Sequence, residues 1–326
     1  MNALPATRLP TWRLTDLRPT PGDILGDTLA GLSMSPRRLP SKYFYDARGS
    51  KLFEQITRQP EYYPTRVELG LLEDRVADIA CAVGPNVHVV EYGSGSGRKT
   101  RLLLEALNHP VAYTPIEISR STVLESTARL AEEFPHIEML PVCADFTRPV
   151  TLPEPLQDAR STLVFFPGST LGNFVDDDAV TLLAAMRETM GPHGQALIGI
   201  DLDKDPSLLE AAYNDAAGVT AQFTLNLLTR LNREIGSDFD IDAFMHRAVY
   251  ARERGRIETD LVSLQGQTVH VAGRAFEFAA GEAMRVEYSC KYTDERFAAL
   301  AARAGLRVVD GWNDPRDWFG LRLLQA

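Results

Sequence analysis

A glycine-rich turn behind an apolar run is the first feature of this chain that could do chemistry. Residues 87–100 read V-H-V-V-E-Y-G-S-G-S-G-R-K-T, so the run ends at the acid Glu91 and leads into Gly93, Gly95 and Gly97. Glycine lets the backbone turn sharply and lets a ligand approach it closely. A strand, such a turn and a helix together form a nucleotide-shaped site at the carboxyl edge of a parallel sheet. The alternative is a strand–helix turn without a ligand.

The spacing of the glycines distinguishes two cofactors. A dinucleotide fingerprint requires G-x-G-x-x-G, but Arg98 stands where its third glycine would be. The order G-x-G-x-G behind an acidic strand end resembles motif I of class I S-adenosylmethionine (SAM) methyltransferases. The resemblance implies SAM as the methyl donor and S-adenosylhomocysteine as the product.

The elements around this turn alternate between strands and helices. Strands are expected over residues 87–92, 111–118, 137–142, 162–166 and 195–201, and helices over residues 66–83, 100–107, 120–133 and 177–190. Such alternation is typical of a doubly wound parallel sheet. A helix over 294–304 and strands over 306–311 and 321–324 predict the terminal antiparallel hairpin of a class I methyltransferase.

A second unit interrupts this pattern. Residues 215–231 read as a helix, and residues 257–264, 268–278 and 284–289 read as antiparallel strands with Gly266 and Gly281 as turn signals. We therefore expect an α/β, Rossmann-like SAM domain over 66–202 and 292–326. A smaller α+β substrate lobe takes up 1–65 and 203–291, with the first dozen residues loosely ordered. The alternative is that the segments 1–65 and 203–291 are extensions of one compact domain.

The composition is that of a globular protein with ample apolar material for a core. The 326 residues are 44% hydrophobic and 24% charged, with a net charge of -10. The acidic balance disfavours a nucleic-acid substrate. Three scattered cysteines predict neither a disulfide framework nor a zinc site. Since we find no apolar run of membrane-span length and no signal-peptide core, we expect a cytoplasmic protein that does not act on membranes.

Five further motifs resemble the L-histidine Nα-methyltransferases of ergothioneine biosynthesis. They are S-K-Y-F-Y-D-A-R-G-S-K-L-F-E-Q-I-T at 41–57, P-E-Y-Y-P-T-R at 60–66, F-P-G-S-T-L-G-N-F at 166–174, Y-N-D-A-A-G at 213–218 and R-V-E-Y-S-C-K-Y at 285–292. The resemblance covers the chain from about residue 39 onward. It implies trimethylation of the α-amino group of L-histidine to hercynine, the first step of ergothioneine biosynthesis. It also implies a sulfoxide synthase that acts on hercynine as the pathway partner, and no metal.

The resemblance also implies which residues bind the cofactor. Gly93 would lie beside the methionine carboxylate of SAM, and Lys99 would contact that carboxylate. Glu117, at a position where the family often has aspartate, would accept hydrogen bonds from the ribose hydroxyls. Asp145 would accept from the adenine amino group, while Phe146 would pack on the ring. Each charged group has a plain alternative as a solvated lysine or a strand-end acid.

A second set of residues is implied for the acceptor amino acid. Asn173 and Tyr213 would bind its carboxylate, since a neutral amide and a phenol do this without burying another charge. Gly168 would leave the path of the methyl group open, and Tyr45 would lie near the amine. Tyr62 would lie near the imidazole, although the adjacent tyrosine is an alternative. The alternatives are that the tyrosines only pack in the core and that Asn173 is a loop amide.

Glu287 and Ser289 are two residues apart on an expected strand, so their side chains point to one face. A carboxylate and a hydroxyl can bind the two imidazole nitrogens, whereas phenylalanine would leave both groups unpaired. A solvent-facing E-x-S pair is the alternative. Thr259 departs from the family, which often has methionine there, and this puts the exact substrate in doubt.

The expected reaction is an in-line displacement in which the protein chiefly supplies alignment. It needs no covalent nucleophile, and the sequence places no clear general base. Two alternatives remain: an N-methyltransferase for another amino acid such as tyrosine or tryptophan, and a SAM-binding module without catalysis. The oligomeric state stays open, a monomer included.

Overall fold

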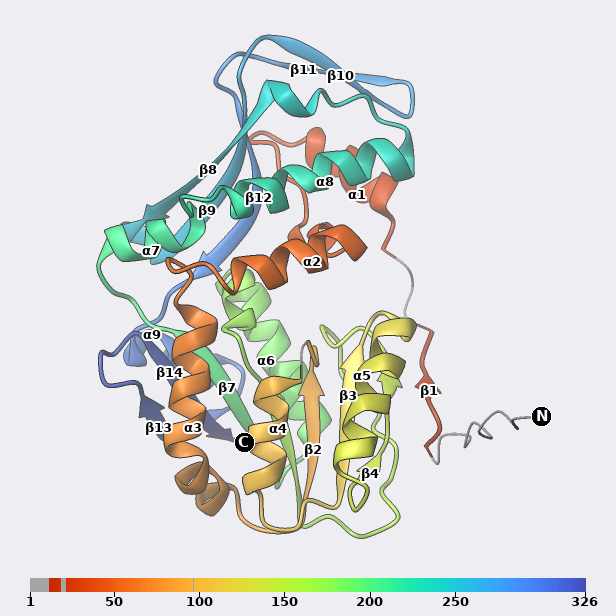
Figure 1. The fold of residues 1–326 in the computed structure, drawn as a ribbon, viewed down its shortest axis with the longest axis vertical. Coiled ribbons are helices and arrows are strands. Elements are labelled where there is room, and N and C mark those ends of the chain that lie inside the picture. Colours follow the sequence, from red (N-terminus) through yellow and green to blue (C-terminus); the bar gives the residue numbers. More distant parts are fainter. Residues whose placement is uncertain (1–11, 19–21, 96) are drawn as a thin grey trace, which may run out of the picture.

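A mixed sheet forms the lower half of the molecule in the computed structural model, which describes residues 12–18, 22–95 and 97–326 (Figure 1). Its strand order is β1-β5-β3-β2-β6-β7-β14-β13, with β4 paired to β3. The bounds are β1 Thr15–Asp16, β2 Val87–Tyr92, β3 Ala112–Glu117, β4 Glu138–Met139, β5 Val142–Cys143, β6 Ser161–Phe166, β7 Gln195–Asp201, β13 Arg307–Asn313 and β14 Phe319–Gln325. All neighbours pair in parallel except β14, which is antiparallel to both β7 and β13.

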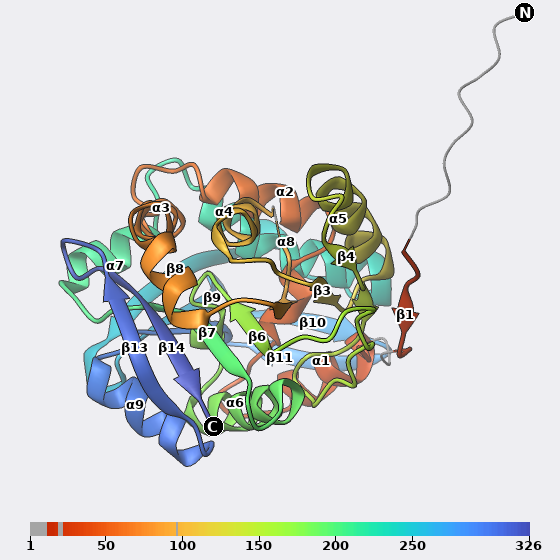
Figure 2. The same ribbon diagram turned by 90° about the horizontal axis from the view of Figure 1, so that it is seen from below.

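Helices cover both faces of this sheet (Figure 2). α3 (Pro64–Val83), α4 (Arg98–Ala106) and α5 (Arg120–Glu133) lie on one face, and α6 (Asp176–Met190) and α9 (Asp294–Arg303) on the other. Alternate residues of β2 supply the two cores, Val87 and Val89 on the first face and Val90 and Tyr92 on the second. Burial on both faces explains why this strand reads as a continuous apolar run.

The predicted fold class is confirmed by this topology. The expected strands at β2, β3, β6 and β7 and the terminal hairpin are present, and α5 has the predicted bounds. The single strand expected over 137–142 is wrong, because Leu140 and Pro141 separate β4 from β5. Proline has no N–H to donate to a sheet, so it interrupts the ladder at this point.

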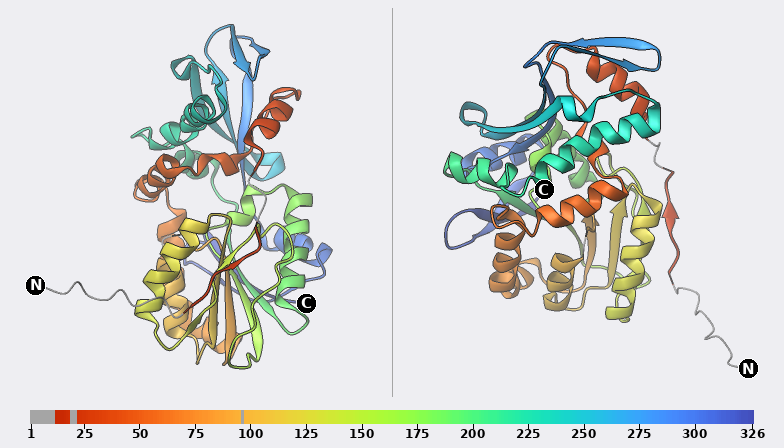
Figure 3. Two further views of the ribbon diagram at one scale, coloured as in Figure 1. Left: turned by 90° about the vertical axis from the view of Figure 1, so that its right-hand side faces the viewer. Right: turned by 45° about the horizontal axis from the view of Figure 1, so that its top comes forward.

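A lobe lies above the carboxyl edge of the sheet (Figure 3). It contains a three-stranded antiparallel sheet, β12-β9-β8, and a separate hairpin of β10 and β11. Its elements are α1 Ile24–Leu32, α2 Ala47–Ile56, α7 Pro206–Tyr213, α8 Val219–Ile235, β8 Phe244–Ala251, β9 Arg256–Ser263, β10 Gln267–Val271, β11 Arg274–Phe278 and β12 Ala283–Cys290. Phe44, Phe223, Leu261 and Met284 are among the residues of its own apolar core.

Two predictions for the lobe need correction, and one strand was missed. The strand expected over 268–278 is a hairpin, because Ala272 and Gly273 both have positive φ angles, 48° and 78°, in a two-residue turn. The helix expected from residue 215 begins at Val219, where the Asp215 carboxylate accepts from the amides of Val219 and Thr220. β8 was not predicted, because exposed Met245 and Val249 obscure its alternating pattern.

The chain leaves the sheet for the lobe and returns to it at neighbouring points. Leu202 and Tyr292 form a parallel bridge, and the amide of Asp203 donates to the carbonyl of Tyr292 over 2.9 Å. β1 pairs with β5 of the large sheet, so it departs from the predicted assignment of residues 1–65 to the lobe. The remaining boundaries stay a prediction. Residues 1–11, most of the segment expected to be loosely ordered, lie outside the described residues. In the described ranges, no helix has the length and apolarity needed to cross a membrane.

Candidate active site

The glycine-rich turn lies where β2 ends and α4 begins. Gly93, Gly95 and Gly97 all have positive φ angles, 77°, 48° and 72°. Among the described residues, and apart from the chain neighbours of each glycine, no atom lies within 4 Å of the place a Cβ would take at Gly93 or Gly95. The turn therefore combines a backbone conformation that favours glycine with open space beside it. This is the arrangement that a closely approaching ligand requires.

Two carboxylates end the neighbouring strands on this side of the sheet. Glu117, the last residue of β3, accepts hydrogen bonds from the amide of Ser94 over 2.7 Å and from its hydroxyl over 3.2 Å. Burial raises the pKa of Glu117, and the bonds from Ser94 oppose that shift. Asp145, which follows β5, accepts from the amide and the hydroxyl of Thr147. Both acids are thus oriented by groups in short turns.

An aromatic platform lies beside these acids. Phe146 stacks on Tyr92 with ring centroids 5.2 Å apart and an angle of 26° between planes. It also meets Phe166 edge-on at 5.9 Å. Phe146 is half-buried, so part of its surface remains free to pack on a ligand ring. The open turn, the two acids and this platform together fit an adenosine with an amino-acid tail.

A buried carboxylate on α3 contacts both the cofactor side of the site and the loop that follows β6. Glu68 is fully buried, and it accepts from the amide of Gly168 through both oxygens, over 2.9 and 3.0 Å. It also forms an ion pair with Lys99. A Cβ at Gly199 would lie 2.5 Å from the Glu68 carboxylate, so glycine in β7 makes room for it. Lys99, predicted to face the cofactor carboxylate, is therefore held by Glu68.

Glu91, the acid before the turn, is buried beneath the site. It accepts hydrogen bonds from Thr100 over 2.8 and 2.9 Å and from Tyr113. Burial raises the pKa of Glu91 to about 8, against the lowering effect of those hydroxyls. Its carboxyl joins β2, β3 and α4, so it supports the turn from below.

On the lobe side, β12 presents alternate residues to the site. Glu287 is opposite Thr259 and Ser289 is opposite Ile257 in the antiparallel ladder with β9. Because direct cross-strand partners share a face, Thr259 lies on the same face as Glu287. Burial raises the pKa of Glu287 to about 7, with Lys291 opposing the shift. The Thr259 hydroxyl is buried and has no hydrogen-bond partner among the described residues.

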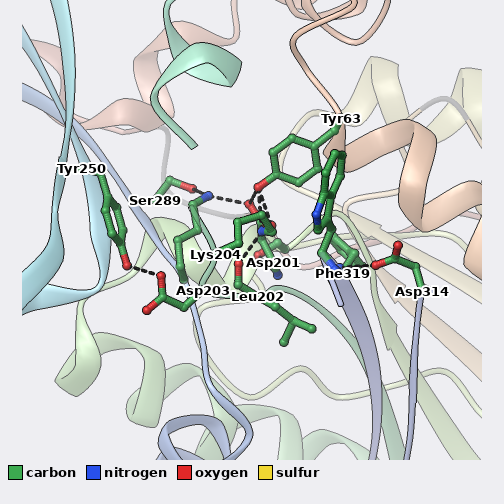
Figure 4. A network of polar contacts seen from close by, with 12 residues as sticks. Tyr63, Asp201, Leu202, Asp203, Lys204, Tyr250, Ser289, Asp314 and Phe319 are labelled. Atoms are coloured by element: carbon green, nitrogen blue, oxygen red, sulfur yellow. Dashed lines mark hydrogen bonds and ion pairs between the residues drawn. The ribbon is translucent and has the colours of Figure 1, made fainter. Parts of the chain in front are cut away.

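A buried polar network closes the base of the site (Figure 4). The Asp201 carboxylate at the end of β7 accepts from Tyr63, Lys204 and Lys291 over 2.7–2.9 Å. Burial would raise the pKa of Asp201, but the two lysines outweigh it and hold that pKa below its ordinary value. Lys291 also donates to the hydroxyls of Ser289 over 2.9 Å and Tyr213 over 3.0 Å. Those two hydroxyls lie 2.7 Å apart.

Tyrosines connect this network to the lobe. Tyr62 packs edge-on against Tyr213 with centroids 6.3 Å apart, whereas its neighbour Tyr63 is buried on Asp201. Tyr62 is thus the one of the two that faces Tyr213. Tyr45 is 45% exposed and meets Phe223 edge-on.

The loop after β6 carries two more predicted residues, Gly168 and Asn173, and the second of them ends a turn on β12. Gly168 has a φ angle of 81°, and a Cβ there would lie 3.6 Å from the Lys99 ammonium. Asn173 is half-buried and ends a short turn, Thr170–Asn173, which packs on β12. The contact is close, since a Cβ at Gly172 would lie 2.8 Å from the carbonyl oxygen of Cys290.

The structure brings the predicted residues to one edge, but sequence reasoning missed the residues that hold them. Four of these stand out: Glu68, Asp201, Lys204 and Lys291. The only signals available were indirect. Glu68 follows P-E-Y-Y-P-T-R by two residues, and Lys291 lies inside R-V-E-Y-S-C-K-Y. Burial of a charge cannot be inferred from its place in a motif.

Comparison with known proteins identifies the family to which this chain belongs. Residues 24–326 match the family described as histidine-specific, SAM-dependent methyltransferases. The chain is 43% identical to the histidine N-alpha-methyltransferase of Mycolicibacterium smegmatis and 40% identical to that of Mycobacterium tuberculosis, in each case over 91% of this chain and 93% of the relative. It is 32% identical to ergothioneine biosynthesis protein 1 of Neurospora crassa, over 89% of this chain and 33% of that protein. The chain therefore belongs to the histidine-specific, SAM-dependent methyltransferase family.

Proposed function

We propose that this protein transfers three methyl groups from SAM to the α-amino nitrogen of L-histidine, giving hercynine, and so starts ergothioneine biosynthesis. The observation that carries the proposal is the match of nearly the whole chain to histidine N-alpha-methyltransferases. The arrangement of Glu287 and Ser289 on one face of β12 supports the choice of substrate. S-adenosylmethionine supplies the methyl group already activated on a sulfonium.

The residues at the carboxyl edge of the large sheet would hold the cofactor. The open backbone at Gly93 accommodates its amino-acid end, and Lys99, fixed by Glu68, gives that end a positive charge. Glu117 would accept from the ribose hydroxyls and Asp145 from the adenine amine. Phe146 would pack on the adenine face. The cofactor domain in this proposal consists of residues 66–202 and 292–326.

The lobe and the loop after β6 would hold histidine. Asn173 would donate to the substrate carboxylate, with Tyr213 beside it. Glu287 and Ser289 would bind the imidazole, and Tyr62 would pack near the ring. The substrate lobe in this proposal is residues 203–291 together with the part of 1–65 that follows β1.

The chemistry needs alignment and loss of a proton from the amine before each transfer. Gly168 leaves the approach to the amine free of a side chain, and its amide is held by Glu68. The exposed Tyr45 would offer an aromatic face to the increasingly methylated, cationic amine. Holding the reacting groups in line can supply roughly 7–11 kcal/mol of the barrier. The described residues around Gly168 give no evident base, so water would carry the proton away.

The test is mass spectrometry of a reaction of the purified protein with SAM and equal amounts of the twenty amino acids. The expected product is histidine carrying three methyl groups, with no other amino acid modified. Methylation of a different amino acid would contradict the substrate but not the cofactor. SAM binding without any methylation would contradict the enzymatic function. A cytoplasmic location, a monomeric state and a hercynine-using sulfoxide synthase as pathway partner stay predictions.

A further inference from the structure

Lys291 occupies an unusual position for a lysine, since its side chain is fully buried at the centre of the polar network. Its ammonium donates to the Asp201 carboxylate, the Ser289 hydroxyl and the Tyr213 hydroxyl over 2.7, 2.9 and 3.0 Å. An ammonium has three protons and no acceptor, so these bonds use its whole capacity. Burial lowers its pKa, but Asp201 and Tyr213 outweigh that effect and raise it, so Lys291 is charged at neutral pH.

These bonds leave the two hydroxyls to share one contact, and their relative acidity sets its direction. Each oxygen accepts from Lys291, and the 2.7 Å contact between the oxygens uses one of the two hydroxyl protons. A phenol is a stronger acid than an alcohol, so Tyr213 donates and Ser289 accepts. The proton that remains free is the one on Ser289. Ser289 therefore presents a hydrogen-bond donor to the substrate, while Glu287, two residues away on the same face, presents an acceptor.

The charges around Ser289 also disfavour a cation at this position. The cluster contains two lysines, Lys204 and Lys291, around one aspartate, Asp201. A cation placed against Ser289 would lie next to the Lys291 ammonium in a buried region, where like charges repel strongly. The other titratable groups that face Glu287 are the phenols of Tyr45, Tyr62 and Tyr213, which are neutral at neutral pH.

We propose that Lys291 is a positioning residue that restricts the substrate ring to its neutral form. Ser289 donates to the unprotonated ring nitrogen, and Glu287 accepts from the N–H of the other nitrogen. A protonated ring would direct its second N–H at the Ser289 donor and leave both groups unpaired. This rests on the proposed function, and it assigns the Tyr213 proton to Ser289 instead of the substrate carboxylate.

The experiment compares KM for histidine with KM for 1,2,4-triazolylalanine from pH 5.5 to 8. The triazole ring stays neutral over this range, so it reports the titration of the amine and of Glu287 alone. In the wild type, the ratio of the two KM values should rise about tenfold for each pH unit below the ring pKa of about 6.5. In Lys291→Met, Ser289 is free to accept and the ammonium is gone, so the ratio should stay nearly flat.

Two further variants separate the parts of the proposal. Tyr213→Phe keeps the Lys291 ammonium but frees one acceptor site on the Ser289 oxygen, so its slope should lie between those of the wild type and Lys291→Met. Ser289→Ala removes the donor and keeps the ammonium, so it should give an intermediate slope, and it serves if Lys291→Met does not fold. A flat wild-type ratio, or an unchanged slope in Lys291→Met and Ser289→Ala, would overturn the inference. Failure of the wild type to methylate histidine at any pH would instead overturn the proposed function.

Discussion

The cofactor edge and the substrate edge of the site are held in different ways. At the cofactor edge, Glu117 is bound by Ser94 in the turn after the adjacent strand and Asp145 by Thr147 two residues away. At the substrate edge, Ser289 and Tyr213 are fixed by Lys291, whose partner Asp201 is 90 residues distant. Asp201 is itself bound by Tyr63, 138 residues distant.

The cofactor acids are therefore positioned locally, whereas the substrate hydroxyls are positioned by packing between distant elements. Short turns and neighbouring strands orient the cofactor acids, so the sheet alone can place them. The substrate hydroxyls reach their geometry only when the lobe, β7, β12 and the start of α3 are packed together. Substitutions at the substrate edge should therefore reduce both stability and histidine binding. Substitutions at the cofactor edge should affect that edge alone.

The largest expected effect follows from Asp201→Asn. It leaves Lys204 and Lys291 buried with one neutral partner, and breaking such a pair costs roughly 3–5 kcal/mol of stability. Histidine KM should rise far more than the dissociation constant of S-adenosylhomocysteine, measured by calorimetry on the folded protein. Asp205→Asn at the exposed N-cap of α7 is the matched control and should change neither. Equal loss of both ligands would break the comparison.

Glu68→Gln tests the point where the two edges meet. The amide can still accept from Gly168, but Lys99 loses its counter-ion, so misplacement of the transfer position should lower kcat by up to about 100-fold. Gly199→Ala should resemble it, because the new methyl group displaces the Glu68 carboxylate. Glu73→Gln, at an exposed position of the same helix, is the control. Wild-type kcat in Glu68→Gln would show that Glu68 only fills space.

A pH titration of stability examines Glu91, the buried acid beneath the cofactor edge. The pKa of Glu91 is about 8 in the folded protein and ordinarily 4.5, so the folded state holds this proton more tightly than the unfolded state. The contribution of Glu91 to stability should therefore be full below pH 4.5 and be lost as pH rises toward 8. Glu91→Gln lacks this term, so the difference in Tm between variant and wild type should grow with pH. A constant difference would contradict the shifted pKa, and Glu287→Gln separates the similar contribution of that group.

The smallest expected effect belongs to Thr259→Val. Its hydroxyl is buried without a described partner, so removing it at nearly constant shape should raise stability by about 1 kcal/mol. Thermal unfolding measures this change. Histidine KM should stay the same if the hydroxyl makes no contact with the substrate. A rise in KM would show that Thr259 binds the substrate, and would extend the substrate edge to β9.

The sheet could be predicted from the sequence because its strands are buried on both faces and appear as apolar runs, as Val87–Tyr92 does. The site residues followed from motifs at the strand ends. Lys291, Asp201 and Glu68 could not be recognised in the same way. Glu68 and Lys291 are charged residues in mixed stretches and Asp201 ends the apolar strand β7, and the burial of each charge depends on a partner on another element. The β10–β11 turn was missed because Ala272, an ordinary residue, adopts a positive φ angle there.

The bridge between Leu202 and Tyr292 has a consequence for how the lobe can change. It closes a loop of about 90 residues, whose closure entropy grows only with the logarithm of its length. Doubling such a loop would add about 0.6 kcal/mol, which is small beside the packing of the lobe's own core. The large sheet is thus thermodynamically insensitive to the length of what is inserted there. Substrate selectivity can be rebuilt within the lobe while the machinery for methyl transfer keeps its geometry.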